Sequence, residues 1–81
     1  MNEIILLKGM FADAKKRYKE ADLEASALIV AIRNVLNPFE DDLSLIDTEK
    51  ALIMMKRLNE LVTNLKELKS KIKKLEQDLN G

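Results

Sequence analysis

The sequence predicts an all-α fold: an antiparallel two-helix hairpin of coiled-coil type that dimerises into a four-helix bundle. Two stripes of apolar residues recur at alternating steps of three and four, which places each stripe along one face of an α-helix in a left-handed coiled coil. The first stripe is Ile4, Leu7, Phe11, Ala14, Tyr18, Ala21, Ala25, Leu28, Ile32 and Val35. The second stripe is Ala51, Met54, Leu58, Leu61, Leu65, Leu68, Ile72, Leu75 and Leu79. Aromatic residues make up only 4% of the chain, which is typical of long helices rather than of sheet folds.

Each stripe defines one helix of a single helical-hairpin domain over residues 1–81. We expect the first helix over about residues 3–36, a connection over about residues 37–46, and the second helix over about residues 47–79. Residues 80–81, an asparagine and a glycine, are expected to end the second helix, because both residue types suit a helix C-terminus.

The connection carries its own boundary signals. Asn37 precedes Pro38, and proline cannot continue the hydrogen-bond ladder of a helix, so the first helix should end there. Ser44 or Asp47 could cap the second helix, because both side chains accept hydrogen bonds from free N–H groups of a first turn. Phe39 is expected to close this end of the bundle.

Side-chain size and charge support an antiparallel pairing of the two stripes. Folding the chain about residue 41 places Ala14 opposite Leu68, and similar small-opposite-large pairs recur along the stripes, which lets layers interdigitate. The same register brings Glu24 near Arg57. A short connection between two long helices also favours antiparallel neighbours.

Several apolar residues lie outside both stripes near the connection. Ile29, Leu36, Met55 and Val62 share one flank of the predicted hairpin, and Leu52 is adjacent. Two helices can bury only one face of each other, and an apolar patch left in water is an association site. We therefore predict that these five residues form the interface of a homodimer.

Lysines gather in the half of the hairpin that lies away from the connection. We take Lys15, Lys16, Lys66, Lys69 and Lys73 as a candidate surface for a protein partner or a nucleic acid, since cationic side chains can track phosphates. Acidic residues interrupt this patch, and the chain has 14 basic and 14 acidic residues, so nucleic-acid binding is the alternative rather than the first interpretation.

The residues that are absent exclude most chemistry. The chain has no cysteine and no histidine, so it lacks thiol nucleophiles, imidazole bases and the usual zinc ligands. Glu40, Asp41, Asp42, Asp47 and Glu49 form an acidic cluster, but its spacing differs from that of a Ca²⁺-binding loop. We predict a chain that is not an enzyme and that binds no cofactor or metal.

These observations predict a non-enzymatic structural or protein-interaction module, a homodimeric hairpin acting as an adaptor or small chaperone-like binder of a further protein. The alternative is an electrostatic nucleic-acid-binding protein that uses its lysine-rich end. The first residues lack the basic segment and the apolar run of a signal peptide, and no stretch is long enough to span a bilayer, so we expect a cytoplasmic location without membrane contact.

Overall fold

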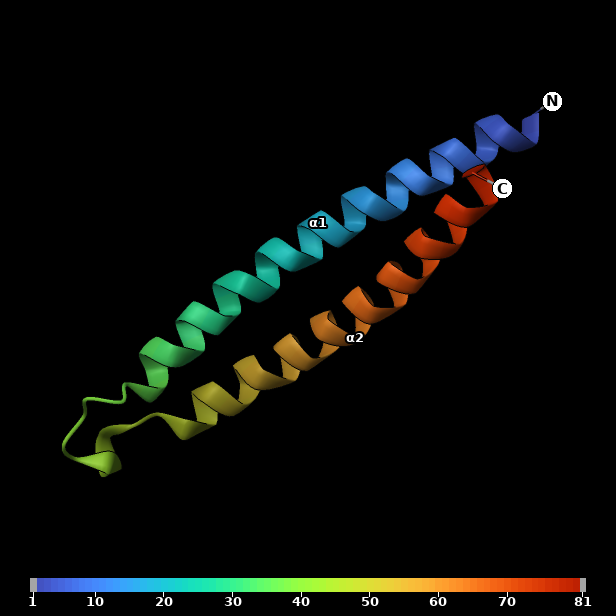
Figure 1. Ribbon diagram of the computed structural model, residues 1–81. Helices are drawn as coiled ribbons and strands as arrows, with labels where there is room; N and C mark the ends of the chain where they lie inside the picture. Colours follow the sequence, from blue (N-terminus) through green and yellow to red (C-terminus); the bar gives the residue numbers. More distant parts are fainter. Residues whose placement is uncertain (1, 81) are drawn as a thin grey trace.

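The chain folds as a long hairpin of two helices joined by a short connection. The computed structural model describes residues 2–80, which form α1 (Asn2–Leu36), the short 3-10 helix η1 (Leu43–Leu45) and α2 (Thr48–Asn80). Figure 1 shows α1 and α2 lying side by side and running in opposite directions, with the connection at one end. We call the other end the open end. The hairpin measures 64 × 16 × 15 Å between its Cα atoms, and the predicted all-α hairpin is confirmed.

The core lies in the single seam between α1 and α2. Every residue of the two predicted stripes except Ile4 is buried or half-buried, so the heptad spacing identified the seam correctly. The fully buried residues are Ala14, Ala21, Ala25, Ile32, Ala51, Leu61, Leu68 and Leu75. Half of these are alanines, so the seam is closely packed but contains little apolar volume.

Packing along the seam follows the predicted small-opposite-large pattern. Ala14 packs with Leu68 and Leu75 in one cluster, and the half-buried Leu7, Phe11, Tyr18 and Ile72 surround them. In a second cluster, Ala21 and Ala25 pack with Leu61, and Leu28, Leu58 and Leu65 surround them. Alanines on α1 let the backbones approach each other, and leucines of α2 fill the space that remains.

Side-chain hydrogen bonds order the connection between the helices. Asn37 adopts the left-handed φ of 28°, which asparagine tolerates better than most residues, and its side chain accepts the Phe39 N–H at 3.2 Å. Asp42 caps η1 by accepting the Ser44 N–H at 3.1 Å and the Ser44 hydroxyl at 2.6 Å. Asp47 caps α2 by accepting the Lys50 N–H at 3.0 Å, so of the two expected caps Asp47 fills the role.

Three expectations from the sequence differ from the structure at the ends of the hairpin. Ile4 is 61% exposed, because the seam opens where α1 begins. Phe39 is 88% exposed and does not close the hairpin; it follows the left-handed residue Asn37, whose side chain accepts the Phe39 N–H. Asn80 is still helical, and the predicted role of Gly81 lies outside the described residues.

Gly9 lies inside α1 and offers a simple stabilising substitution. A Cβ atom built at Gly9 meets no atom within 4 Å, and Gly9 is exposed with an ordinary helical φ. Gly9→Ala should therefore raise the free energy of unfolding by about 0.5–1 kcal/mol, because alanine loses less backbone entropy than glycine in a helix. Urea denaturation at a fixed protein concentration measures this change, and a loss of stability would contradict the open surroundings of Gly9.

Candidate interaction surface

The two flanks of the hairpin seam have different characters. On one flank, which we call the ion-pair flank, Arg57 of α2 donates to Glu24 of α1 from Nε at 2.6 Å and from Nη2 at 3.0 Å. Arg57 also contacts Glu60 at 3.3 Å. Residues from both helices line a shallow hollow on this flank: Arg17, Glu20, Ala21, Glu24, Arg57, Leu61, Asn64 and Leu68. Charged side chains therefore cover the ion-pair flank.

The pairing of Glu24 with Arg57 predicted from the sequence register is confirmed, and it has a measurable consequence. The hydrogen bond from Arg57 holds the pKa of the Glu24 carboxyl below its ordinary value, although partial desolvation opposes this. The pair therefore stabilises the fold when the pH is above the carboxyl's pKa in the unfolded chain. That contribution is lost as the pH falls through the lower folded-state pKa.

We expect an NMR titration to give Glu24 a pKa below that of an unpaired glutamate. Arg57→Ala should raise it towards the ordinary value, because the hydrogen bond that favours the carboxylate is removed. Arg33→Ala, which removes the same charge from a site more than two helical turns away on α1, is the matched control and should leave the Glu24 pKa unchanged. An unshifted Glu24 in the unmodified chain would contradict the ion pair.

Lysines line the opposite flank, which we call the lysine flank. Lys15 and Tyr18 of α1 and Lys69 and Ile72 of α2 enclose a groove of about 310 Å³ there. One lysine side chain from each helix therefore borders this groove, beside an aromatic and an aliphatic side chain. Such a groove suits a ligand that combines an apolar group with negative charge.

Heptad steps from these two lysines lead along the same flank towards the connection. Seven and fourteen residues before Lys69 lie Val62 and Met55, and fourteen residues after Lys15 lies Ile29. The five predicted interface residues, Ile29, Leu36, Leu52, Met55 and Val62, are called the apolar segment of the lysine flank. Four of them are 42–60% exposed, and Val62 is half-buried. The heptad spacing thus assigns the predicted residues to one flank, and the hairpin itself leaves four of the five exposed.

The lysine flank has a basic segment towards the open end. It comprises Lys8, Lys15, Lys19, Lys66, Lys69 and Lys73, which the heptad spacing places on this flank and which are all exposed. Lys15, Lys66, Lys69 and Lys73 were predicted from the sequence, whereas Lys8 was missed, although its heptad position would have identified it. Lys16 lies one step further round α1, beside Lys15 and Lys19.

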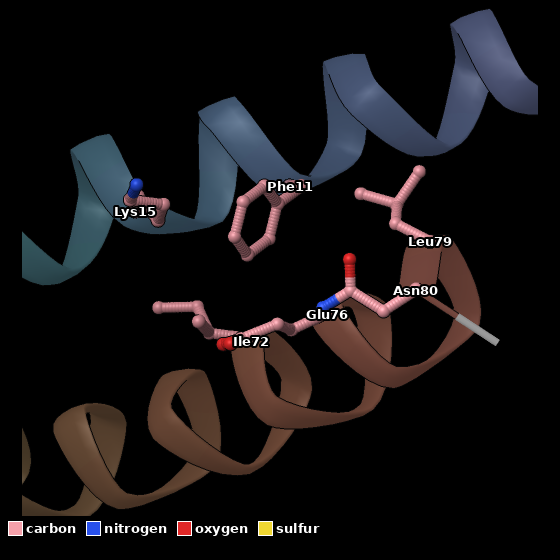
Figure 2. A pocket seen from close by; sticks show the side chains of 6 residues that line it. All are labelled: Phe11, Lys15, Ile72, Glu76, Leu79 and Asn80. Atoms are coloured by element: carbon pink, nitrogen blue, oxygen red, sulfur yellow. The ribbon is translucent and has the colours of Figure 1, made fainter.

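A second hollow lies closer to the open end of the hairpin. Figure 2 shows the Phe11 ring directed from α1 towards α2 above Ile72, with Glu76, Leu79 and Asn80 on the facing helix. The hollow has a volume of about 370 Å³, and the Lys15 ammonium lies 4.9 Å from the centre of the Phe11 ring. Its lining holds one carboxylate and one amine but no nucleophile paired with a base, so it does not support catalysis by such a pair.

The acidic side chains of the connection hold its turns in place. Hydrogen bonds from the side chain and backbone of Ser44 lower the pKa of Asp42, and Glu40 accepts the Asp42 N–H at 3.1 Å. Among residues 2–80, no three acidic side chains gather closely enough to hold a metal ion. In the same range, neither helix has an apolar stretch of the length needed to cross a membrane.

Comparisons with models of known protein families, with curated proteins and with solved structures found no match for this chain.

Proposed function

We propose that the protein is a non-enzymatic interaction module, a homodimeric helical hairpin that serves as an adaptor or small chaperone-like binder. The observation that carries this proposal is the exposed apolar segment of the lysine flank, where Ile29, Leu36 and Met55 are each 42–47% exposed. A second copy of the chain covers this segment and forms a four-helix bundle. The faces that remain outside the bundle then bind the further partner.

The exposed surface of the hairpin is large enough for an interface with a second copy of the chain. The chain exposes 6629 Å², whereas a compact monomer of 9.3 kDa exposes about 5,000 Å². The excess is roughly 1,600 Å² on one chain, which is about twice the ~800 Å² that each partner buries in a standard protein interface. With alanines forming half of the buried core, the hairpin also has little apolar burial to offset its chain entropy.

Exposed apolar residues outside the lysine flank support the binding of a further protein. Leu23 and Val30 on the outer face of α1 are 66% and 57% exposed, and Ile53 of α2 is 70% exposed. A dimer that buries the apolar segment leaves these residues in water. They therefore form a candidate surface for apolar stretches of another chain.

Light scattering across a dilution series tests this proposal. We expect a mass of twice 9.3 kDa that persists on dilution, together with binding of an environment-sensitive hydrophobic dye to the outer apolar residues. A monomer that binds no dye would overturn the proposal, because such a chain would have neither a dimer interface nor an exposed apolar surface for a partner.

A second candidate function is electrostatic binding of nucleic acid, which the groove between Lys15 and Lys69 favours. Six lysines on one flank offer several phosphate contacts, and such binding weakens steeply with salt. Titration of duplex and single-stranded DNA and RNA at low salt tests it, and the absence of binding there would exclude it.

A further inference from the structure

We propose that the two hairpins of the dimer are antiparallel and staggered, so that the acidic connection of each copy lies on the basic segment of the other. This inference rests on the proposed homodimer and names its geometry. It follows from the order of features along the lysine flank, which runs from basic at the open end, through apolar, to the acidic connection.

Charge complementarity is the first support. Residues 40–49 carry five acidic groups and no basic one, and all of these acidic residues except the half-buried Glu40 are exposed. The basic segment carries six lysines on one flank, beside which the acidic Glu76 and Asp22 also lie by heptad position. Since opposite potentials across an interface fix its orientation, each connection suits the other copy's basic segment.

The distances along the hairpin agree with this stagger. Ile29 and Met55 lie near the middle of the apolar segment. Leu36, where α1 ends, lies about 10 Å from Ile29 in the direction of the connection, at ~1.5 Å per residue. Because the hairpin is 64 Å long and α1 accounts for about 50 Å of it, the connection extends roughly 10 Å beyond α1. It therefore lies about 10–25 Å from Ile29, and Lys15 lies about 21 Å from Ile29 in the opposite direction.

A two-fold axis near Ile29 and Met55 thus produces two kinds of contact at once. The apolar segments of both copies meet at the centre, and each connection reaches the other copy's basic segment. A parallel dimer that buries the same apolar segment would instead place two acidic connections side by side, and such like-charge contacts oppose association.

The exposed Phe39 gives the connection an apolar anchor for this contact. Its ring is 88% exposed, and it immediately precedes the acidic run at Glu40–Asp42. The groove between the helices is lined by the apolar side chains of Tyr18 and Ile72 together with the side chains of Lys15 and Lys69, whose charges lie on the same flank. An aromatic ring beside carboxylates matches that lining, because the ring packs on the apolar side chains while the carboxylates meet the lysines.

Thiol cross-linking between two single-cysteine variants tests this geometry, since the natural chain contains no cysteine. Asp42→Cys and Lys15→Cys chains, one carrying a mass tag, are unfolded together, refolded as a mixture and treated with a short bifunctional maleimide. We expect a cross-linked product that contains one chain of each kind. Asp42→Cys treated alone should give little homodimeric product.

Arg17→Cys is the matched control for Lys15→Cys, because it removes the same charge two residues away but lies on the ion-pair flank. Its mixture with Asp42→Cys should give little cross-linked product. Efficient linking of Asp42→Cys to itself, or equal linking to both partners, would overturn the staggered geometry. Light scattering on the same variants separates the two proposals: a dimer with the wrong cross-links refutes only the stagger, whereas a monomer refutes the homodimer itself.

Discussion

Replacing Ile29 with glutamate should dissociate the proposed dimer into monomers. Ile29 lies at the middle of the apolar segment, and a carboxylate there would be buried against apolar side chains without a partner. Because the axis passes close to Ile29, the two introduced charges would also face each other. Burying an unpaired charge costs several kcal/mol, and every 1.4 kcal/mol changes an affinity tenfold, so we expect the dissociation constant to rise at least about a hundredfold.

Light scattering at several concentrations measures this effect, and Leu23→Glu is its matched control. Leu23 is 66% exposed on the outer face of α1. Leu23→Glu therefore makes the same apolar-to-acidic change on the same helix, but outside the apolar segment. It should leave the mass unchanged, and so should Lys73→Ala. Val62→Lys should dissociate the assembly as Ile29→Glu does. If the dimer persisted in both of these charge variants, the interface would lie on another flank.

Heptad spacing determined most of the fold because the seam of a two-helix coiled coil depends on little else. Residues such as Ala21 and Leu61 had only one partner helix to pack against, so periodicity and the position of Pro38 were enough to place them. The Glu24–Arg57 pair followed from the same register. No competing layer or sheet was available to override these local preferences.

The ends of the hairpin were predicted less well, because there the backbone departs from a repeating geometry. The orientation of Phe39 depends on the left-handed turn at Asn37, and periodicity contains no information about that turn. Whether Ser44 or Asp47 caps α2 depended on η1, which Asp42 stabilises and which uses Ser44 inside its own turn. In each case a local hydrogen bond of one side chain decided the path of the chain.

The candidate surface could be predicted in part. Residues seven apart, such as Met55 and Val62, were assigned to one flank because heptad positions repeat. The groove between Lys15 and Lys69 was not expected, since the sequence indicated only that lysines gather in this half of the hairpin. The placement of Tyr18 and Ile72 between these lysines follows from side-chain packing rather than from spacing.

Leu61→Ala should cause a large loss of stability, because Leu61 is the least exposed of the large side chains in the seam. Leu61 is 4% exposed and packs with Ala21 and Ala25, which are too small to collapse into the space that its removal leaves. A leucine-to-alanine change at such a site typically lowers the free energy of unfolding by about 2–5 kcal/mol, through lost burial and a residual cavity. Small domains have a total stability of only about 5–15 kcal/mol, so this variant should be substantially unfolded at moderate urea concentrations.

Leu23→Ala is the matched control, because it makes the same chemical change at an exposed helical position and gains the same helix propensity. It should alter the free energy of unfolding by less than about 0.5 kcal/mol. Both variants must be compared with the unmodified chain at one protein concentration, since the stability of a dimer depends on concentration. Similar losses in the two variants would mean that Leu61 does not pack in the seam. A large loss confined to Leu61→Ala would show that the hairpin depends on the leucines that fill the space opposite its alanines.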